Sequence, residues 1–120
     1  MRNCLLVLLL TGCATKLVDI DYNTQPPADW PQLEERITYA DIPTIRRWCN
    51  MPKGMRAYNC AVVSFRYGLC MIYLSDQNDA SALAHERAHC QGYSHVGEGR
   101  RAHAAWERWN RDQKVELLAQ

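Results

Sequence analysis

The sequence lacks both a long apolar run and an excess of charge of one sign. No apolar stretch approaches the ~20 residues that a helix needs to span a bilayer. The 14 basic and 13 acidic side chains give a net charge of +1. A general nucleic-acid binder needs a surplus of Lys and Arg for phosphate contacts, so we exclude that class. With 48% hydrophobic residues among 120, the composition is typical of one small globular domain and not of a disordered chain.

The N-terminal residues have the parts of a secretory signal peptide. A basic start at Met1-Arg2 precedes an apolar run from Leu5 to Leu10, and small residues follow it. The stretch Leu10-Thr11-Gly12-Cys13 resembles a bacterial lipobox. The resemblance implies that residues 1–12 are removed and that Cys13 becomes the lipidated first residue of the mature chain. The alternative is an ordinary signal peptide, or a short anchor, that happens to contain Cys13.

The lipobox resemblance implies a lipid-anchored protein of the bacterial cell envelope. Ala14 follows the lipidated position, and by resemblance to enterobacterial lipoproteins the absence of Asp there favours the outer membrane, facing the periplasm. Residues 13–32 include Pro26-Pro27 and Trp30-Pro31 without a sustained period. Pro-rich polar segments stay extended, so we expect a lipidated N-terminus and a flexible tether over 13–32. The folded domain is expected over residues 33–120.

Helix and strand signals in the rest of the chain predict a small α+β domain. Asp41 and Asp79 are suitable N-caps, each just before a segment of helical composition. Two β-rich runs flank a tight turn that contains Gly68, which predicts an antiparallel β-hairpin. The expected elements are a short helix after Asp41, a loop at 50–54, strands at 58–65 and 69–74, a helix at 80–91 that ends at Gly92, and a C-terminal helix at 100–118.

Four cysteines remain after signal-peptide removal and lipidation. In an oxidising compartment an even number predicts two disulfides; the alternative is free buried thiols. With the hairpin turn centred on Tyr67, Cys70 would lie opposite Ser64 and Cys60 opposite Leu74, which is too far for Cys60 to bond to Cys70. Two pairings stay open, and we favour the first because it links both helices to the hairpin: Cys49–Cys60 with Cys70–Cys90, or Cys49–Cys70 with Cys60–Cys90.

The Ala-rich helix and the loop after it contain the pattern H-E-x-x-H-x-x-G-x-x-H. His85 and His89 are four residues apart, so on a helix both imidazoles project from one face and can reach one metal ion. Gly92 can adopt a positive φ and turn the chain back. His95 can then return as a third ligand beside an open position for water. Glu86 is expected to face this water as a general base, because zinc lowers the pKa of water.

These eleven residues resemble the zinc-binding motif of the metzincin metallopeptidases. The resemblance implies a minimal zincin-like fold, with a short antiparallel sheet, a zinc-binding helix and a closing C-terminal helix. It also implies that the strand at 69–74 is the sheet edge that pairs with an extended peptide substrate. The implied roles are Zn²⁺ binding by His85, His89 and His95, general-base catalysis by Glu86, and the turn at Gly92.

The sequence departs from the metzincin pattern after His95. All four Met residues precede it, so the Met-containing turn that lies beneath the metal in that family is absent. Trp106 or Trp109 is expected to supply an apolar floor instead. His103 is expected to be a packed or solvated residue of the last helix. A carboxylate third ligand, as in thermolysin-like enzymes, is an alternative that the spacing of His95 disfavours; its candidates are Glu98, Glu107 and Glu116.

The motif and the N-terminus together predict a zinc-dependent hydrolase of amide bonds on the periplasmic side of a bacterial membrane. Its substrates would be peptides or the peptide cross-links of the cell wall, and the residues do not choose between them. The alternative is a non-catalytic lipoprotein in which zinc and two disulfides staple a small fold for partner docking. A third hypothesis, a disulfide-stapled lipoprotein without metal, applies only if no metal binds.

Overall fold

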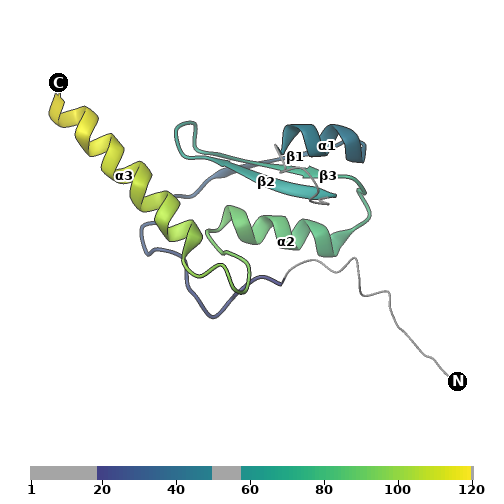
Figure 1. Ribbon diagram of the computed structural model, residues 1–120. Coiled ribbons are helices and arrows are strands. Elements are labelled where there is room, and N and C mark those ends of the chain that lie inside the picture. Colours follow the sequence, from purple (N-terminus) through teal and green to yellow (C-terminus); the bar gives the residue numbers. More distant parts are fainter. Residues whose placement is uncertain (1–18, 50–57, 120) are drawn as a thin grey trace, which may run out of the picture.

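The computed structural model describes residues 19–49 and 58–119 and has an α+β fold (Figure 1). Its sheet has three strands, and one helix packs on each face, so the domain has three layers. A third helix lies at one end of the molecule, and its last turns project beyond the rest. The elements are β1 (Glu34–Tyr39), α1 (Ile42–Trp48), β2 (Asn59–Ser64), β3 (Leu69–Leu74), α2 (Ala80–Cys90) and α3 (Arg101–Ala119).

The sheet is mixed, in the order β1-β3-β2. β2 and β3 form the expected antiparallel hairpin, whereas β1 pairs in parallel with β3. β1 was not predicted from the sequence, and its only partly buried residue is Ile37. Because β1 occupies one side of β3, the prediction of 69–74 as an edge strand was wrong. The edges of the described sheet belong to β1 and β2.

The register of the hairpin differs by one residue from the expected one. Cys70 lies opposite Val63, and Cys60 lies opposite Tyr73. Because side chains alternate between the faces of a strand, this shift places Cys60 and Cys70 on opposite faces of the sheet. Each can therefore bond only to a helix on its own face. The structure has the favoured pairing, Cys49–Cys60 to α1 and Cys70–Cys90 to α2, with Cα–Cα distances of 6.2 Å and 5.6 Å.

The core lies between the sheet and α2. On β3, Cys70, Ile72 and Leu74 alternate toward α2 and are almost completely buried, and Ala82 and Cys90 meet them from the helix. Alanine lets the helix approach the sheet closely, because a larger side chain would hold the two apart. The Cys70–Cys90 disulfide lies inside this core, which fixes the C-terminal end of α2 against the central strand.

Both predicted N-caps are confirmed. The Asp41 side chain accepts a hydrogen bond from the Thr44 amide at 2.9 Å, and the Asp79 side chain accepts one from the Ala82 amide at 2.9 Å. Each cap satisfies a backbone N–H that has no partner within its helix. The predicted loop at 50–54 lies outside the described residues.

Residues 19–32 pack against the domain, so the prediction of a flexible tether was wrong for this part of 13–32. The Trp30 indole N–H donates to the Cys90 carbonyl at 2.9 Å. Its ring contacts Phe65 and Trp106. A large aromatic side chain gains enough from such burial to order the Pro-rich segment around it. Cys13 and the predicted signal peptide lie outside the described residues.

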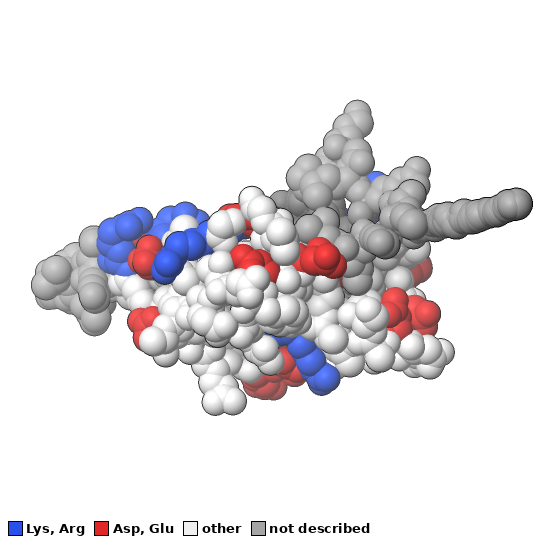
Figure 2. Space-filling model, turned by 90° about the horizontal axis from the view of Figure 1, so that it is seen from below, with Lys and Arg blue, Asp and Glu red and all other residues white. Residues whose placement is uncertain are grey.

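The surface carries charges of both signs. Viewed from below relative to Figure 1, Lys and Arg gather toward one end, and uncharged side chains cover much of the middle (Figure 2). Within the described part of the chain, no helix has the length and apolar character required to cross a membrane.

Candidate metal centre

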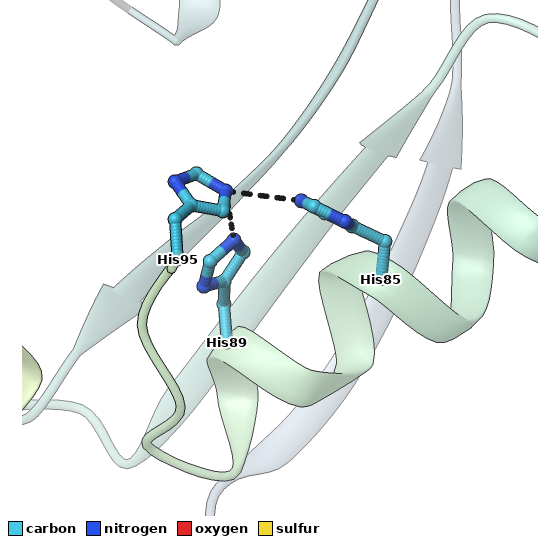
Figure 3. A group of neighbouring side chains, drawn as sticks. All are labelled: His85, His89 and His95. Atoms are coloured by element: carbon cyan, nitrogen blue, oxygen red, sulfur yellow. Dashed lines mark hydrogen bonds between the residues drawn. The ribbon is translucent and has the colours of Figure 1, made fainter. Parts of the chain in front are cut away.

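Three histidines converge on one point beside α2 (Figure 3). His85 and His89 project from one face of α2, as their spacing predicts. Gly92 has φ +96, a conformation that other residues rarely adopt, and there the chain leaves the helix and returns His95 to the same face. The Nε2 atom of His95 lies 3.1 Å from Nε2 of His85 and 3.0 Å from Nε2 of His89. The predicted group of three is confirmed as a possible metal site.

The other ring nitrogens show why a cation fits between these rings. Nδ1 of His89 lies 2.9 Å from the Tyr93 carbonyl oxygen, which can only accept, so Nδ1 carries the hydrogen. Nδ1 of His95 lies 3.2 Å from a carboxylate oxygen of Glu98 and carries its hydrogen for the same reason. In the neutral rings, each Nε2 atom then presents a lone pair. Two lone pairs 3.0 Å apart repel each other, and a shared cation removes this repulsion.

The electrostatics of the site favour a metal ion over a proton as this cation. Burial, together with the neighbouring His89 and His95, lowers the pKa of His85 to about 4. Burial also lowers the pKa of His89, although the Tyr93 carbonyl opposes this effect. Both imidazoles are therefore neutral near pH 7, the form that binds metals.

The loop that carries His95 is held from two sides. Ile20 forms an isolated antiparallel β-bridge with His95. Beside it, the Asp21 amide donates to the Ser94 carbonyl at 2.9 Å, and the Val96 amide donates to the Asp19 carbonyl at 2.8 Å. On the other side, the Ser94 hydroxyl accepts from the Ala102 amide at the start of α3. Segments from both ends of the described chain thus support the third histidine.

Glu98 belongs to the site through its contacts with His95, a position that was not predicted from the sequence. One carboxylate oxygen accepts from the His95 amide at 3.0 Å and lies 3.2 Å from Nδ1 of the same residue. The other oxygen accepts from Arg101 at 3.0 Å. Burial raises the pKa of the Glu98 carboxyl, but hydrogen bonds from His95 and the attraction of its ring outweigh burial and hold it below its ordinary value. Glu98 is therefore ionised near pH 7.

Glu86 lies on the side of α2 that faces the sheet, between Ala82 and Cys90 on the same helical face. It is only 4% exposed. Burial raises the pKa of its carboxyl to about 7. No hydrogen bond or ion pair to Glu86 occurs among the described residues. A carboxylate with this degree of burial and no partner is unfavourable for folding, and such groups occur preferentially at functional sites.

Neither His103 nor Glu107 joins the group of described side chains whose donor atoms converge. Trp106 and Trp109 contact Phe65, and Trp106 also contacts Trp30; their role as a floor beneath the metal stays a prediction. His103 was expected to be either packed or solvated, and it is packed. It is 6% exposed, and its Nε2 atom lies 2.6 Å from the Gln25 carbonyl oxygen. Glu107 is exposed on α3, and the Glu116 side chain is outside the described set.

Comparisons with known proteins found no match: no family model, no curated protein and no solved structure resembles the chain closely enough to assign it. The resemblance to metzincins therefore rests on the eleven-residue motif alone, and the structure adds that its three histidines could hold a metal ion.

Proposed function

We propose that the protein is a zinc-dependent hydrolase of amide bonds. The observation that carries this proposal is the solitary buried carboxyl of Glu86 next in sequence to His85, one of three converging histidines. A metal that only stapled the fold would need no such carboxyl. A hydrolase needs one, because a group with a pKa near 7 can take a proton from water and return it to the leaving amine.

The donor set supports zinc as the metal. Nitrogens bound to one tetrahedral zinc at about 2.0–2.1 Å would lie about 3.3 Å apart, close to the observed 3.1 Å and 3.0 Å. Among the described His, Cys, Asp and Glu side chains, no fourth residue joins this group. Three protein ligands and an open position are typical of catalytic zinc, whereas structural zinc has four protein ligands.

Each residue has a definite part in the proposed reaction. Zinc, when bound, would supply a Lewis acid that lowers the pKa of water and polarises the amide carbonyl. The three histidines hold their Nε2 lone pairs toward one point, which keeps the site organised before substrate arrives. Glu86 takes the proton of the attacking water, and the protonated carboxyl then donates to the amine that leaves. Burial limits the solvation of the Glu86 carboxylate by bulk water and so raises its pKa to about 7. A carboxyl with this pKa can both accept and return a proton near neutral pH.

The sheet edge nearest the histidines suits an extended peptide. Arg87 of α2 pairs with Glu35 of β1 at 2.9 Å, so this side of the helix faces β1. His85 and His89 are each two positions from Arg87, which places them on the opposite side of the helix, toward β2. β2 is an edge strand of the described sheet, and a peptide can add to such an edge by backbone hydrogen bonds. This replaces β3 as the proposed substrate strand.

The proposed location is the periplasmic side of a bacterial membrane, with a lipid on Cys13. Support comes from the signal-like N-terminus and from the two disulfides, since disulfides persist in oxidising compartments. Substrates there would be peptides or cell-wall peptides. Labelling of the expressed chain with a radioactive fatty acid tests the anchor, and the Cys13→Ser variant should carry no label.

The activity is tested with purified wild type and Glu86→Gln, which has nearly the same shape but cannot act as a base. Both are loaded with zinc and given a peptide library and isolated peptidoglycan. We expect wild-type hydrolysis that a chelator abolishes, and at least 100-fold slower hydrolysis by Glu86→Gln. Glu107→Gln, a change at an exposed site on α3, is the matched control and should keep full activity.

The outcomes separate this proposal from the alternative of a non-catalytic zinc staple. Zinc binding without hydrolysis by wild type would support the staple, as would equal rates for wild type and Glu86→Gln. Zinc-edge absorption spectra add an independent measure: three nitrogen ligands and a light fourth ligand are expected for an open site, and four protein ligands would contradict it.

A further inference from the structure

We propose that Glu98 is a positioning residue of the metal centre, whose carboxylate fixes the tautomer and the orientation of the His95 ring. This inference rests on the metal centre of the proposed function, but not on its hydrolytic activity. Neither the H-E-x-x-H-x-x-G-x-x-H pattern nor the comparisons assign Glu98 a role. It would act through His95 and would not touch the substrate.

The carboxylate of Glu98 is directed at the two N–H groups of His95, on the backbone and at Nδ1, that point away from the other two histidines. Oε1 accepts from the backbone N–H at 3.0 Å and lies 3.2 Å from Nδ1. Oε2 accepts from Arg101 at the start of α3, at 3.0 Å. Glu98 therefore connects the ligand loop to a helix. Gly97 and Gly99 flank it with φ of +89 and +63, and these two turns bring the carboxylate back toward residue 95.

His95 needs such support more than the other two ligands do. His85 and His89 project from a regular helix whose backbone fixes their direction, whereas His95 lies in the loop after Gly92. Yet the Nε2 atom of His95 is the one that lies within about 3 Å of both others, at 3.1 Å and 3.0 Å. A small rotation of its ring would move its Nε2 atom away from both of the other nitrogens. Carboxylates that accept the second N–H of a ligating His prevent such rotation and strengthen the ligand.

The same contacts exclude Glu98 as a direct third ligand in place of His95. Its carboxylate lies at the Nδ1 side of the ring, and the metal-facing atom is Nε2. Glu98 is also absent from the group of side chains whose donor atoms converge. The carboxylate candidate considered from the sequence thus supports the third histidine and does not replace it.

The first test is the zinc affinity of wild type, Glu98→Ala and Glu98→Gln, measured by competition with a chromophoric chelator at pH 8. We expect Glu98→Ala to bind zinc 10- to 100-fold more weakly. Glu98→Gln keeps an acceptor oxygen but loses the charge, so its affinity should lie between the two. Glu107→Ala removes an exposed carboxylate from α3 and should bind as wild type does.

The second test reads the tautomer of His95 directly in the metal-free protein. Long-range ¹H–¹⁵N spectra at pH 8 should show a hydrogen on Nδ1 in wild type and a mixture of tautomers in Glu98→Ala. A residue that only stabilised the fold would not alter this signature. If Glu98→Ala does not fold, the affinity and the spectrum of Glu98→Gln give the answer.

Unchanged zinc affinity and an unchanged His95 tautomer in the Glu98 variants would overturn the proposal. Weak zinc binding by wild type itself would count against the metal centre of the proposed function, and the tautomer in the metal-free protein would still decide the role of Glu98. Loss of hydrolysis by itself would not decide the role of Glu98, because the Glu86 experiment measures hydrolysis separately.

Discussion

Gly92 lies against the indole of Trp30: a Cβ atom at position 92 would stand 2.8 Å from Cδ2 of Trp30. It would also stand 2.9 Å from the Cβ atom of Pro26. The turn that brings His95 to the candidate metal site thus requires glycine for two reasons. Its φ of +96 is strained for other residues, and the packed N-terminal segment leaves no space for a side chain.

Gly92→Ala should therefore destabilise the protein by about 2–5 kcal/mol, through both strain and overpacking, and should weaken zinc binding. Gly68→Ala is the matched control: it also has positive φ, but nothing lies within 4 Å of its added Cβ. We expect a loss of about 1–2 kcal/mol there, from strain alone. Urea denaturation measures both, and equal losses would contradict the close packing of Trp30 on Gly92.

Glu86 should make the stability of the metal-free protein depend on pH. Its pKa is raised from 4.5 to about 7 in the folded protein. Between these values the folded state keeps a proton that the unfolded state has released, so the free energy of unfolding falls as pH rises through this window. Glu86→Gln removes this loss. The variant should be more stable than wild type by on the order of 3 kcal/mol at pH 8, with little difference at pH 4.

Comparing the two proteins isolates Glu86 from the histidines. The pKa of His85 is lowered to about 4, so its contribution has the opposite sign and stability falls as pH drops from about 6.5 toward 4. Both proteins share this contribution, and it cancels in the difference between their unfolding free energies. A difference that does not change between pH 4 and pH 8 would show that the Glu86 carboxyl has an ordinary pKa.

The two disulfides should contribute unequally to stability. Loop-closure entropy alone predicts about 3 kcal/mol for each, since their separations are 11 and 20 residues. Cys70 and Cys90 also belong to the core, at 0% and 5% exposure. Cys70→Ala/Cys90→Ala should therefore cost about 3–5 kcal/mol, and Cys49→Ala/Cys60→Ala about 2–3 kcal/mol. Thermal unfolding of the double variants at equal protein concentration ranks them, and the reverse order would contradict the prediction.

The N-terminal segment should contribute to metal affinity. A chain that starts at residue 19 keeps the two backbone hydrogen bonds to the His95 loop, whereas a chain that starts at residue 24 loses both. At about 1 kcal/mol for each bond, the shorter chain should be about 1–2 kcal/mol less stable. It should also bind zinc about tenfold more weakly, because His95 moves more freely. Isothermal titration with zinc compares the two chains, and equal affinities would mean that the β-bridge does not hold the ligand.

Features that depend on neighbouring residues could be predicted from the sequence. Asp79 next to an Ala-rich run predicts the start of α2, and the spacing of four residues puts His85 and His89 on one helical face. Gly92 predicts where the helix ends. These inferences hold because caps, helical periodicity and positive φ are properties of a few consecutive residues.

Features that depend on distant pairings could not be predicted. β1 has mostly exposed side chains, and its role follows from its pairing with β3, about 35 residues further along. The hairpin register was off by one residue, because the turn position alone left it ambiguous. The structure nevertheless has the favoured disulfides, because the observed register places Cys60 and Cys70 on opposite faces of the sheet, where they cannot bond to each other.

The sequence by itself determined the chemistry of the site: the three histidines, the adjacent Glu86 and the glycine turn all lie within eleven consecutive residues. Only the tertiary structure decided the surroundings of that motif. Glu98 meets His95 because two glycine turns fold the loop, and residues 19–32 pack on α2 because Trp30 finds aromatic partners there. A ligand's type and spacing are local properties, whereas its burial, its hydrogen-bond partners and its pKa depend on what the rest of the chain brings to it.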